Sequence, residues 1–89
     1  MPECVGTEMD EIKAILEALI YVSEEPVKEE EILGVFPADR FDLVRQALEE
    51  LVLEYSAVPR GLRIVRVAGG YRMQTRPAHD SWIRSLYRL

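Results

Sequence analysis

Few residues in this sequence have side chains that could carry out chemistry. The 89-residue chain contains one histidine, His79, and one cysteine, Cys4. One of each cannot supply the ligand set of a zinc site, and we expect no Cys–His nucleophile pair within one chain. A lone cysteine also cannot form an internal disulfide. Asp80 or Ser81, directly after the histidine, could serve as a helix N-cap, so His79 has a structural explanation.

Two other patterns resemble functional motifs but have simpler explanations. Gly69-Gly70 lacks both the spacing and the following helix of a phosphate-binding loop. It suits a two-residue hairpin turn, because such turns need the positive φ that glycine adopts freely. The acidic run Glu29-Glu30-Glu31 is typical of a solvated helix face. We therefore expect neither a bound cofactor nor an enzymatic activity.

The composition is that of one globular domain spanning residues 1–89. Apolar residues make up 48% of the chain and charged residues 30%, which is enough for a single hydrophobic core. No apolar run approaches the roughly 18 residues of a membrane-spanning helix. The acidic start of the chain lacks the basic and apolar regions of a secretory signal. With a single cysteine, these features indicate a cytoplasmic protein without a membrane partner.

The net charge of −5 conceals a strong asymmetry between the two parts of the chain. Residues 1–59 carry 4 basic and 15 acidic residues, whereas residues 60–89 carry 7 arginines and one aspartate. Such an arrangement favours either attraction within the fold or charge-complementary docking between chains. The abundance of Glu in helices explains the acidic part but leaves the arginines unexplained.

The spacing of apolar residues predicts a winged helix, a mainly α fold with a small β-hairpin. Apolar residues first recur at helical spacing, then alternate with polar residues as in strands, and then recur at helical spacing again. Pro or Gly bounds each of these segments. We expect three helices, two strands and a last helix, at residues 9–22, 28–35, 39–56, 62–68, 71–76 and 78–89. This order is that of a three-helix bundle with a wing, followed by a C-terminal helix.

The first and third helices show a clear inward stripe, and Asp39 could cap the third helix. The residues expected to face the core from these two helices are Ile12, Ile15, Leu16, Leu19, Ile20, Phe41, Val44, Leu48, Leu51, Val52 and Tyr55.

The third helix is the element that many winged-helix proteins place in the DNA major groove. Outside its apolar stripe, residues 39–56 carry only two positive charges, Arg40 and Arg45, against a larger number of carboxylates. Carboxylates on this face would repel phosphates, so we expect no sequence-specific DNA binding. A winged-helix transcription regulator nevertheless stays open as the alternative function, because arginines on the wing could touch a DNA backbone.

The predicted hairpin suggests a protein-interaction surface. With Gly69-Gly70 as the turn, Ala68 lies opposite Tyr71 and Arg63 lies opposite Arg76. The core face then carries Leu62, Ile64, Ala68, Tyr71 and Met73, and the outer face carries Arg63, Val65, Val67, Arg72, Gln74 and Arg76.

Like charges paired across strands repel, and an anionic partner would relieve the repulsion. That partner could be the acidic helices of the same chain, a second copy or another protein. The alternative is that the valines only suit a strand and the arginines only aid solubility. Trp82 and Tyr87 in the last helix either pack on this domain or belong to an interface with whatever follows it.

The chain resembles the N-terminal domain of the bacterial segregation and condensation protein B family. The resemblance is carried by residues 12–23, by Glu25-Pro26, by residues 44–55 and, most specifically, by residues 60–77, from the turn through the whole wing. It implies a non-catalytic subunit that acts in chromosome condensation and segregation. Such a subunit forms a homodimer and joins a kleisin of the segregation and condensation protein A type and, through it, a structural-maintenance-of-chromosomes (SMC) ATPase.

The resemblance also implies a longer protein, cytoplasmic and associated with the nucleoid through its complex. Family members typically have two winged-helix domains, of which the first forms the homodimer and the second makes much of the kleisin contact. Because the sequence ends at Leu89, we expect residues 1–89 to be the first domain, with self-association as their main role. The candidate interface residues are Arg63, Val65, Val67, Arg72, Arg76, Trp82 and Tyr87.

Overall fold

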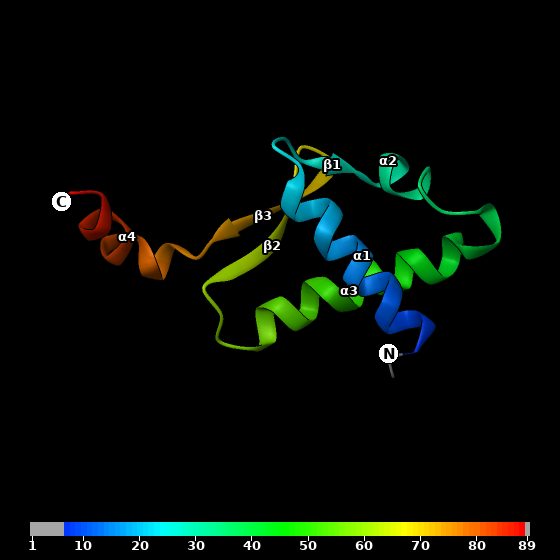
Figure 1. Cartoon of the computed structure of the whole chain (residues 1–89), viewed down its shortest axis with the longest axis horizontal. Coiled ribbons are helices and arrows are strands. Elements are labelled where there is room, and N and C mark those ends of the chain that lie inside the picture. Colours follow the sequence, from blue (N-terminus) through cyan, green and yellow to red (C-terminus); the bar gives the residue numbers. More distant parts are fainter. Residues whose placement is uncertain (1–6, 89) are drawn as a thin grey trace, which may run out of the picture.

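The computed structural model describes residues 7–88, so Cys4 lies outside the described part of the chain. The elements in chain order are α1 (Glu8–Val22), β1 (Val27–Lys28), α2 (Glu29–Leu33), η1 (Ala38–Arg40), α3 (Phe41–Ala57), β2 (Leu62–Val67), β3 (Gly70–Thr75), η2 (Pro77–His79) and α4 (Asp80–Tyr87). Three helices followed by a hairpin confirm the winged-helix prediction (Figure 1).

The first helix begins at a capping box. The Thr7 hydroxyl accepts a hydrogen bond from the Asp10 amide at 3.1 Å, and the Asp10 carboxylate accepts one from the Thr7 amide at 3.3 Å. These bonds satisfy two backbone donors that a helix N-terminus otherwise leaves unpaired. At the other end, the Ser23 hydroxyl donates to the Leu19 carbonyl at 2.7 Å. Pro26 follows shortly after and prevents the helix from continuing.

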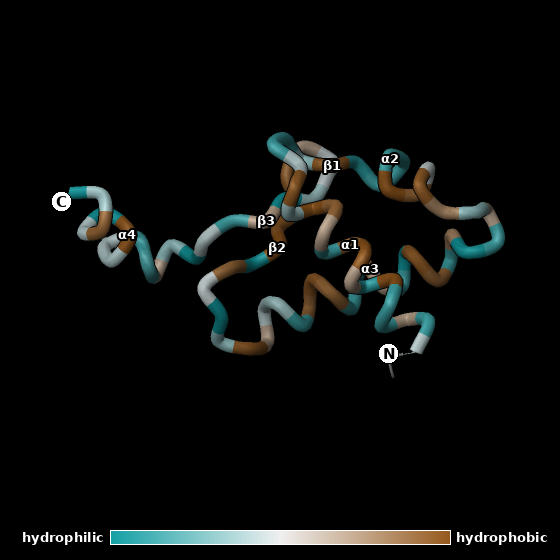
Figure 2. The backbone as a smooth tube through the Cα atoms, viewed as in Figure 1, coloured by the Kyte–Doolittle hydropathy of each residue, from teal (hydrophilic) through white to brown (hydrophobic). Residues whose placement is uncertain are grey.

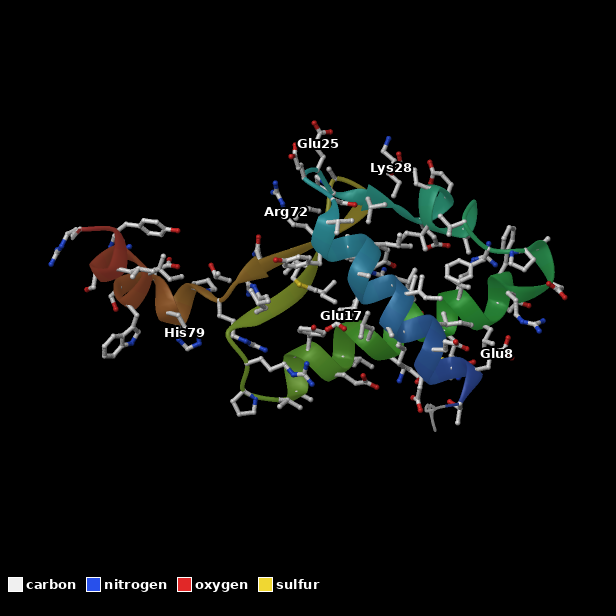
Figure 3. The ribbon with its side chains drawn as sticks, viewed as in Figure 1. Glu8, Glu17, Glu25, Lys28, Arg72 and His79 are labelled. Atoms are coloured by element: carbon white, nitrogen blue, oxygen red, sulfur yellow. The ribbon has the colours of Figure 1, made fainter. Side chains whose placement is uncertain are left out.

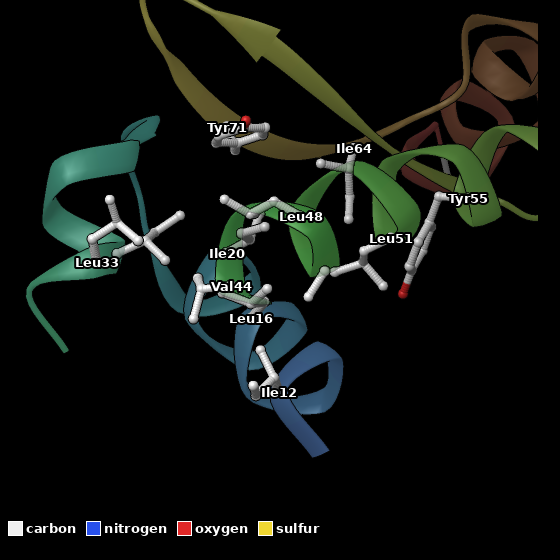
Figure 4. Close-up of a cluster of buried hydrophobic side chains, with 12 residues drawn as sticks. Ile12, Leu16, Ile20, Leu33, Val44, Leu48, Leu51, Tyr55, Ile64 and Tyr71 are labelled. Atoms are coloured by element: carbon white, nitrogen blue, oxygen red, sulfur yellow. The ribbon is translucent and has the colours of Figure 1, made fainter. Parts of the chain in front are cut away.

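The core lies between α1, α2, α3 and the inner face of the hairpin (Figure 4). Figure 2 shows hydrophobic segments alternating with hydrophilic ones along these helices. The buried side chains are those of Ile12, Leu16, Ile20, Ile32, Leu33, Val44, Ala47, Leu48, Leu51, Tyr55, Ile64 and Tyr71. The predicted inward stripe is confirmed for most of its members, but Ile15 is 40% exposed. It lies on the side of α1 that no other element covers fully.

The hairpin turn differs from the prediction by one residue. The two residues with positive φ are Ala68 (φ 50°) and Gly69 (φ 78°), and Gly70 already belongs to β3. Both central residues of a type I′ turn need positive φ, and here alanine occupies the first of these positions. The pairs across the hairpin are therefore Val67–Gly70 and Arg66–Tyr71, so the predicted pairing of Ala68 with Tyr71 is wrong.

A third strand, which sequence reasoning missed, joins the hairpin. The two residues of β1 pair with β3, Val27 opposite Tyr71 and Lys28 opposite Gly70, giving the strand order β1-β3-β2. A Cβ on Gly70 would lie 2.8 Å from the Val27 carbonyl oxygen. Gly70 is therefore required by the close approach of β1, not by the conformation of the turn.

Several helix boundaries also differ from the prediction. The second helix is shorter, and Asp39 lies in η1 instead of capping α3, whose N-cap residue Arg40 makes no side-chain capping bond. Likewise, α4 begins at Asp80 after His79, and no side chain caps it. Short 3-10 turns thus introduce both α3 and α4 where the sequence predicted side-chain caps.

The last helix lies apart from the rest of the domain (Figure 1). It packs mainly against η2, the turn that precedes it, and none of its residues is buried. The molecule measures 49 × 35 × 22 Å, and its radius of gyration is 15.0 Å, whereas about 12 Å is typical of a compact domain of this length. We call residues 77–87 the arm.

Candidate functional site

The structure separates the seven candidate interface residues into three groups. Arg63, Val65, Val67 and Arg72 lie on the hairpin, Arg76 follows β3 directly, and Trp82 and Tyr87 belong to α4. The three places are the outer face of the wing, the end of α3 and the arm.

The outer face of the wing carries four of the predicted residues, with a corrected register. Ile64 and Tyr71 are buried, so the side chains of opposite parity point away from the core. On that outer face Val65 pairs with Arg72 and Arg63 pairs with Gln74. The predicted Arg63–Arg76 pair is therefore wrong, and the like-charge repulsion inferred from it does not arise. A one-residue change in the turn shifted every cross-strand pair.

Arg76 is engaged with the end of α3. Its guanidinium donates hydrogen bonds to the backbone carbonyls of Tyr55 and Val58, and its amide donates to the Gly61 carbonyl at 3.1 Å. A cation here satisfies carbonyls that the helix C-terminus leaves unpaired and interacts favourably with the helix dipole. Arg76 therefore has a structural role, because it joins α3 to the base of the arm, and its interface role stays a prediction.

Tyr55 connects the end of α3 to α1. Its ring lies under the Arg60 guanidinium at 4.6 Å, and its hydroxyl donates a hydrogen bond to the Glu17 carboxylate. Burial, and then the neighbouring carboxylate, raise the pKa of Tyr55 above its ordinary value. A tyrosine with a raised pKa stays neutral at physiological pH and acts here as a hydrogen-bond donor.

The acidic helices find their cationic partners within the helical part of the fold. Lys13 contacts both Glu50 and Glu54, Arg40 contacts Glu8, and Arg45 contacts Glu29 at 3.0 Å. Hydrogen bonds to Glu50 and Glu54 raise the pKa of Lys13. Within residues 7–88, no arginine after residue 59 forms an ion pair. The charge asymmetry is thus not neutralised by pairing between wing and helices.

Arg40, directly before α3, and Arg45, within α3, both take part in these ion pairs. Arg40 contacts Glu8 and Asp39, and Arg45 contacts Glu29 and Asp42. Their charges are balanced by carboxylates on either side, so this face offers DNA phosphates little net attraction.

The arm carries the two most exposed large apolar side chains of the described residues, Tyr87 and Trp82. Trp82 is 75% exposed, Leu86 64% and Tyr87 82%. Trp82 and Tyr87 are thus not part of the core, although Trp82 lines a hollow with Arg76, His79 and the end of α3. His79 lies at the root of the arm, where the chain leaves the body (Figure 3).

A groove on the body escaped sequence reasoning. It is a hollow of about 280 Å³ between α1 and the hairpin. Its lining consists of Ala14, Glu17, Ala18, Tyr21, Tyr55, Leu62 and Met73. The signal in the sequence was the pair of alanines four residues apart on α1, which lie on the same helix face and leave space above them. We call this hollow the α1–wing groove.

Two kinds of feature were sought in the described part of the chain, clusters of metal-ligating side chains and membrane-spanning helices. Residues 7–88 contain no cluster of three or more His, Cys, Asp or Glu side chains that could hold a metal ion. In the same range, no helix has the length and apolar character needed to cross a membrane.

Comparisons with known proteins agree with this architecture. Residues 14–89 match the family described as segregation and condensation complex subunit ScpB. Segregation and condensation protein B of Syntrophotalea carbinolica is 40% identical over 77 residues, covering 86% of this chain and 39% of the relative. The protein of Moorella thermoacetica is 42% identical over 82 residues, covering 89% and 40%. The chain thus spans about two fifths of these relatives.

Solved structures show the same fold. ScpB from Mycobacterium tuberculosis superposes with a TM-score of 0.78 at 25% identity, covering 93% of this chain and 51% of that one. A dimer of the ScpB N-terminal domain complexed with an ScpA peptide has a TM-score of 0.78 at 23% identity, covering 90% and 99%. With a family match over most of its length and a shared fold, the chain belongs to the segregation and condensation complex subunit ScpB family.

Proposed function

We propose that this chain is a non-catalytic scaffold domain of a condensin-type SMC–kleisin complex that acts in chromosome condensation and segregation. In this role it contributes contacts between proteins and performs no chemical step. The complex would act in the cytoplasm, on the nucleoid.

The observation that carries this proposal is the exposed apolar side of the arm. Trp82, Leu86 and Tyr87 are each more than 60% exposed, and aromatic residues at this exposure are characteristic of protein interfaces. The outer face of the wing, with Val65 between arginines, supplies a second surface of the type that interfaces use. We propose that both surfaces contribute to contacts between two copies of the chain.

The partners follow from the family. One relative was crystallised as an N-terminal domain dimer with an ScpA peptide, which supports a homodimer and a kleisin of the ScpA type as partners here. Through that kleisin the domain would join the SMC ATPase. The chain covers about two fifths of its curated relatives, which supports residues 1–89 as the first of two domains in a longer protein.

The solution mass of the 89-residue chain tests the proposal. Light scattering over a concentration series should show a transition from the monomer mass to twice that mass. A monomer at tens of micromolar would contradict self-association by this domain.

The alternative, a winged-helix transcription regulator, is tested by an electrophoretic mobility shift with DNA over a salt series. We expect at most weak binding that disappears as salt increases, because only the wing arginines could contact phosphates. Nanomolar binding to one DNA sequence at physiological salt would replace the proposed function with the alternative.

A further inference from the structure

The helix α4 has a charged side opposite its apolar one. At about 100° per residue, its apolar side chains gather on one side of the helix. The opposite side consists of Ser81, Arg84, Ser85 and Arg88, and we call it the arginine side of α4. Arg88 directly follows α4 with a helical backbone (φ −85°, ψ −6°). All four residues are exposed, so the arginine side is open to a partner.

The charges on this side are not used within the fold. Neither Arg84 nor Arg88 forms an ion pair within residues 7–88. The one carboxylate of α4, Asp80, lies in its first turn, where the helix dipole stabilises a negative charge. Asp80 is one turn before Arg84 and two turns before Arg88. The positive charge is therefore concentrated at the end of the arm.

The arm holds these arginines away from the acidic helices. Arg76 has an extended backbone (φ −81°, ψ 137°) and is held by the carbonyls of Tyr55, Val58 and Gly61, and Pro77, which follows, has a fixed φ. The helix α4 therefore lies at one end of a molecule 49 Å long, and α2 lies toward the other end (Figure 1). At physiological ionic strength the Debye length is about 8 Å, so carboxylates at the far end are largely screened.

Arginine and serine without apolar neighbours are suited to a phosphate backbone. Phosphate contacts in protein–DNA complexes come from Arg and Lys side chains and from Ser hydroxyls. A protein partner is instead expected on the apolar side of α4, because protein interfaces centre on aromatic and aliphatic side chains. Arg84 and Arg88 lie one helical turn apart, with about 5–6 Å between their Cβ atoms. Both can therefore contact phosphates of the same strand.

We propose that the arginine side of α4 binds the phosphate backbone of duplex DNA without sequence preference, while the apolar side stays available to a protein. The inference rests on the proposed function, because a complex that acts on the nucleoid brings DNA to the arm. This mode differs from that of a winged-helix regulator, which uses the third helix and the wing. Neither of those elements takes part here, and no side chain of the arginine side reads a base.

Fluorescence anisotropy with labelled duplexes measures this binding. The 89-residue chain should bind two duplexes of unrelated sequence with equal affinity. Two phosphate contacts give a slope of about −2 for log K against log salt concentration, so the affinity should fall at least about tenfold between about 50 and 200 mM salt. Where a dimer places both arms on one duplex, the slope becomes about −4. A slope near zero, or no binding at the lowest salt, would overturn the inference.

Single substitutions locate the contact. Arg84→Gln and Arg88→Gln each remove one of the two phosphate contacts of an arm, so each should halve the slope, whereas Arg84→Lys keeps the charge and should retain it. Arg72→Gln is the matched control, because Arg72 is exposed on the wing and forms no ion pair within residues 7–88. Its slope should equal that of the wild type. An equal loss in Arg72→Gln and Arg84→Gln would refute the assignment to the arm.

The variants are expected to fold like the wild type. Both arginines are exposed and no residue of α4 is buried, so circular dichroism spectra should match that of the wild type. A slope that is halved in Arg84→Lys as well as in Arg84→Gln would mean that the substitution acts through the helix and not through the charge, and this result would also contradict the inference.

An acidic protein segment is the competing anionic partner, and a labelled poly-glutamate peptide tests it. Binding of this peptide as tightly as the duplex, at equal concentration of charges, would overturn the assignment to DNA.

Light scattering on the same samples separates the inference from the proposed function. Arg84→Gln should leave the dimer mass unchanged, because Arg84 lies opposite the apolar side. A dimer that does not bind DNA would refute the inference and leave self-association intact. A monomer that binds DNA with the expected slope would support the inference and contradict self-association.

Discussion

Replacing Gly70 by alanine tests whether the close contact between β1 and β3 holds the wing to the helices. The added Cβ would lie 2.8 Å from the Val27 carbonyl oxygen, 3.0 Å from the Val27 carbonyl carbon and 3.2 Å from the Pro26 carbonyl carbon. All three are backbone atoms, so a side-chain rotation cannot relieve the overlap, and β1 has to move away from β3.

The magnitude follows from two opposing effects. Overpacking of this kind costs about 1–3 kcal/mol, whereas alanine restricts the unfolded chain and returns about 0.4–1 kcal/mol. We expect the free energy of unfolding to fall by about 1–2 kcal/mol. For a domain of this size, Tm should decrease by roughly 5–15 °C.

The chain offers two matched control positions. A Cβ on Gly61 would meet nothing within 4 Å, so Gly61→Ala should be neutral or slightly stabilising. Gly69 has φ 78° and open space around it, so Gly69→Ala should cost about 1 kcal/mol through backbone strain alone.

Urea unfolding followed by circular dichroism gives the free energies, and amide hydrogen exchange reports on β1 itself. Exchange at residues 27–28 should accelerate in Gly70→Ala and stay unchanged in Gly69→Ala. If Gly70→Ala is as stable as Gly61→Ala, then β1 does not pack against β3 as described and the reasoning is refuted.

Three further predictions concern the wing, the end of α3 and the response to pH. Val65→Glu or Val67→Glu should preserve helicity and weaken self-association; an unchanged dimer mass in both variants would remove the outer wing face from the contact. Arg76→Ala should lower the free energy of unfolding by about 1–2 kcal/mol, because charge-assisted bonds to the end of α3 are lost, whereas exposed Arg72→Ala should leave it unchanged. The folded pKa of Tyr55 is raised above its unfolded value of about 10. Stability should therefore decrease as pH rises past about 10, and Tyr55→Phe should flatten that part of the urea-derived curve.

The amino-acid sequence by itself determined the main helices, the hairpin and the class of fold. Apolar periodicity placed the first and third helices, because residues such as Leu16 and Leu48 recur at the spacing that puts them on one face. The charge distribution likewise indicated that the third helix would not favour phosphates. Both properties are local, since they depend only on which side chains neighbour one another along a helix.

Tertiary structure decided the features that depend on segments distant in the chain. The hairpin register changed because Ala68, held in place by the flanking strands, adopts a positive φ that alanine rarely adopts alone. The role of Gly70 emerged only when β1 came within contact distance of β3. Arg76 proved to hold the end of α3, and Trp82 proved to lie on an arm whose direction is set by that anchor. Sequence patterns identify which side chains are apolar or charged, but only packing between elements determines which of them stay available to a partner.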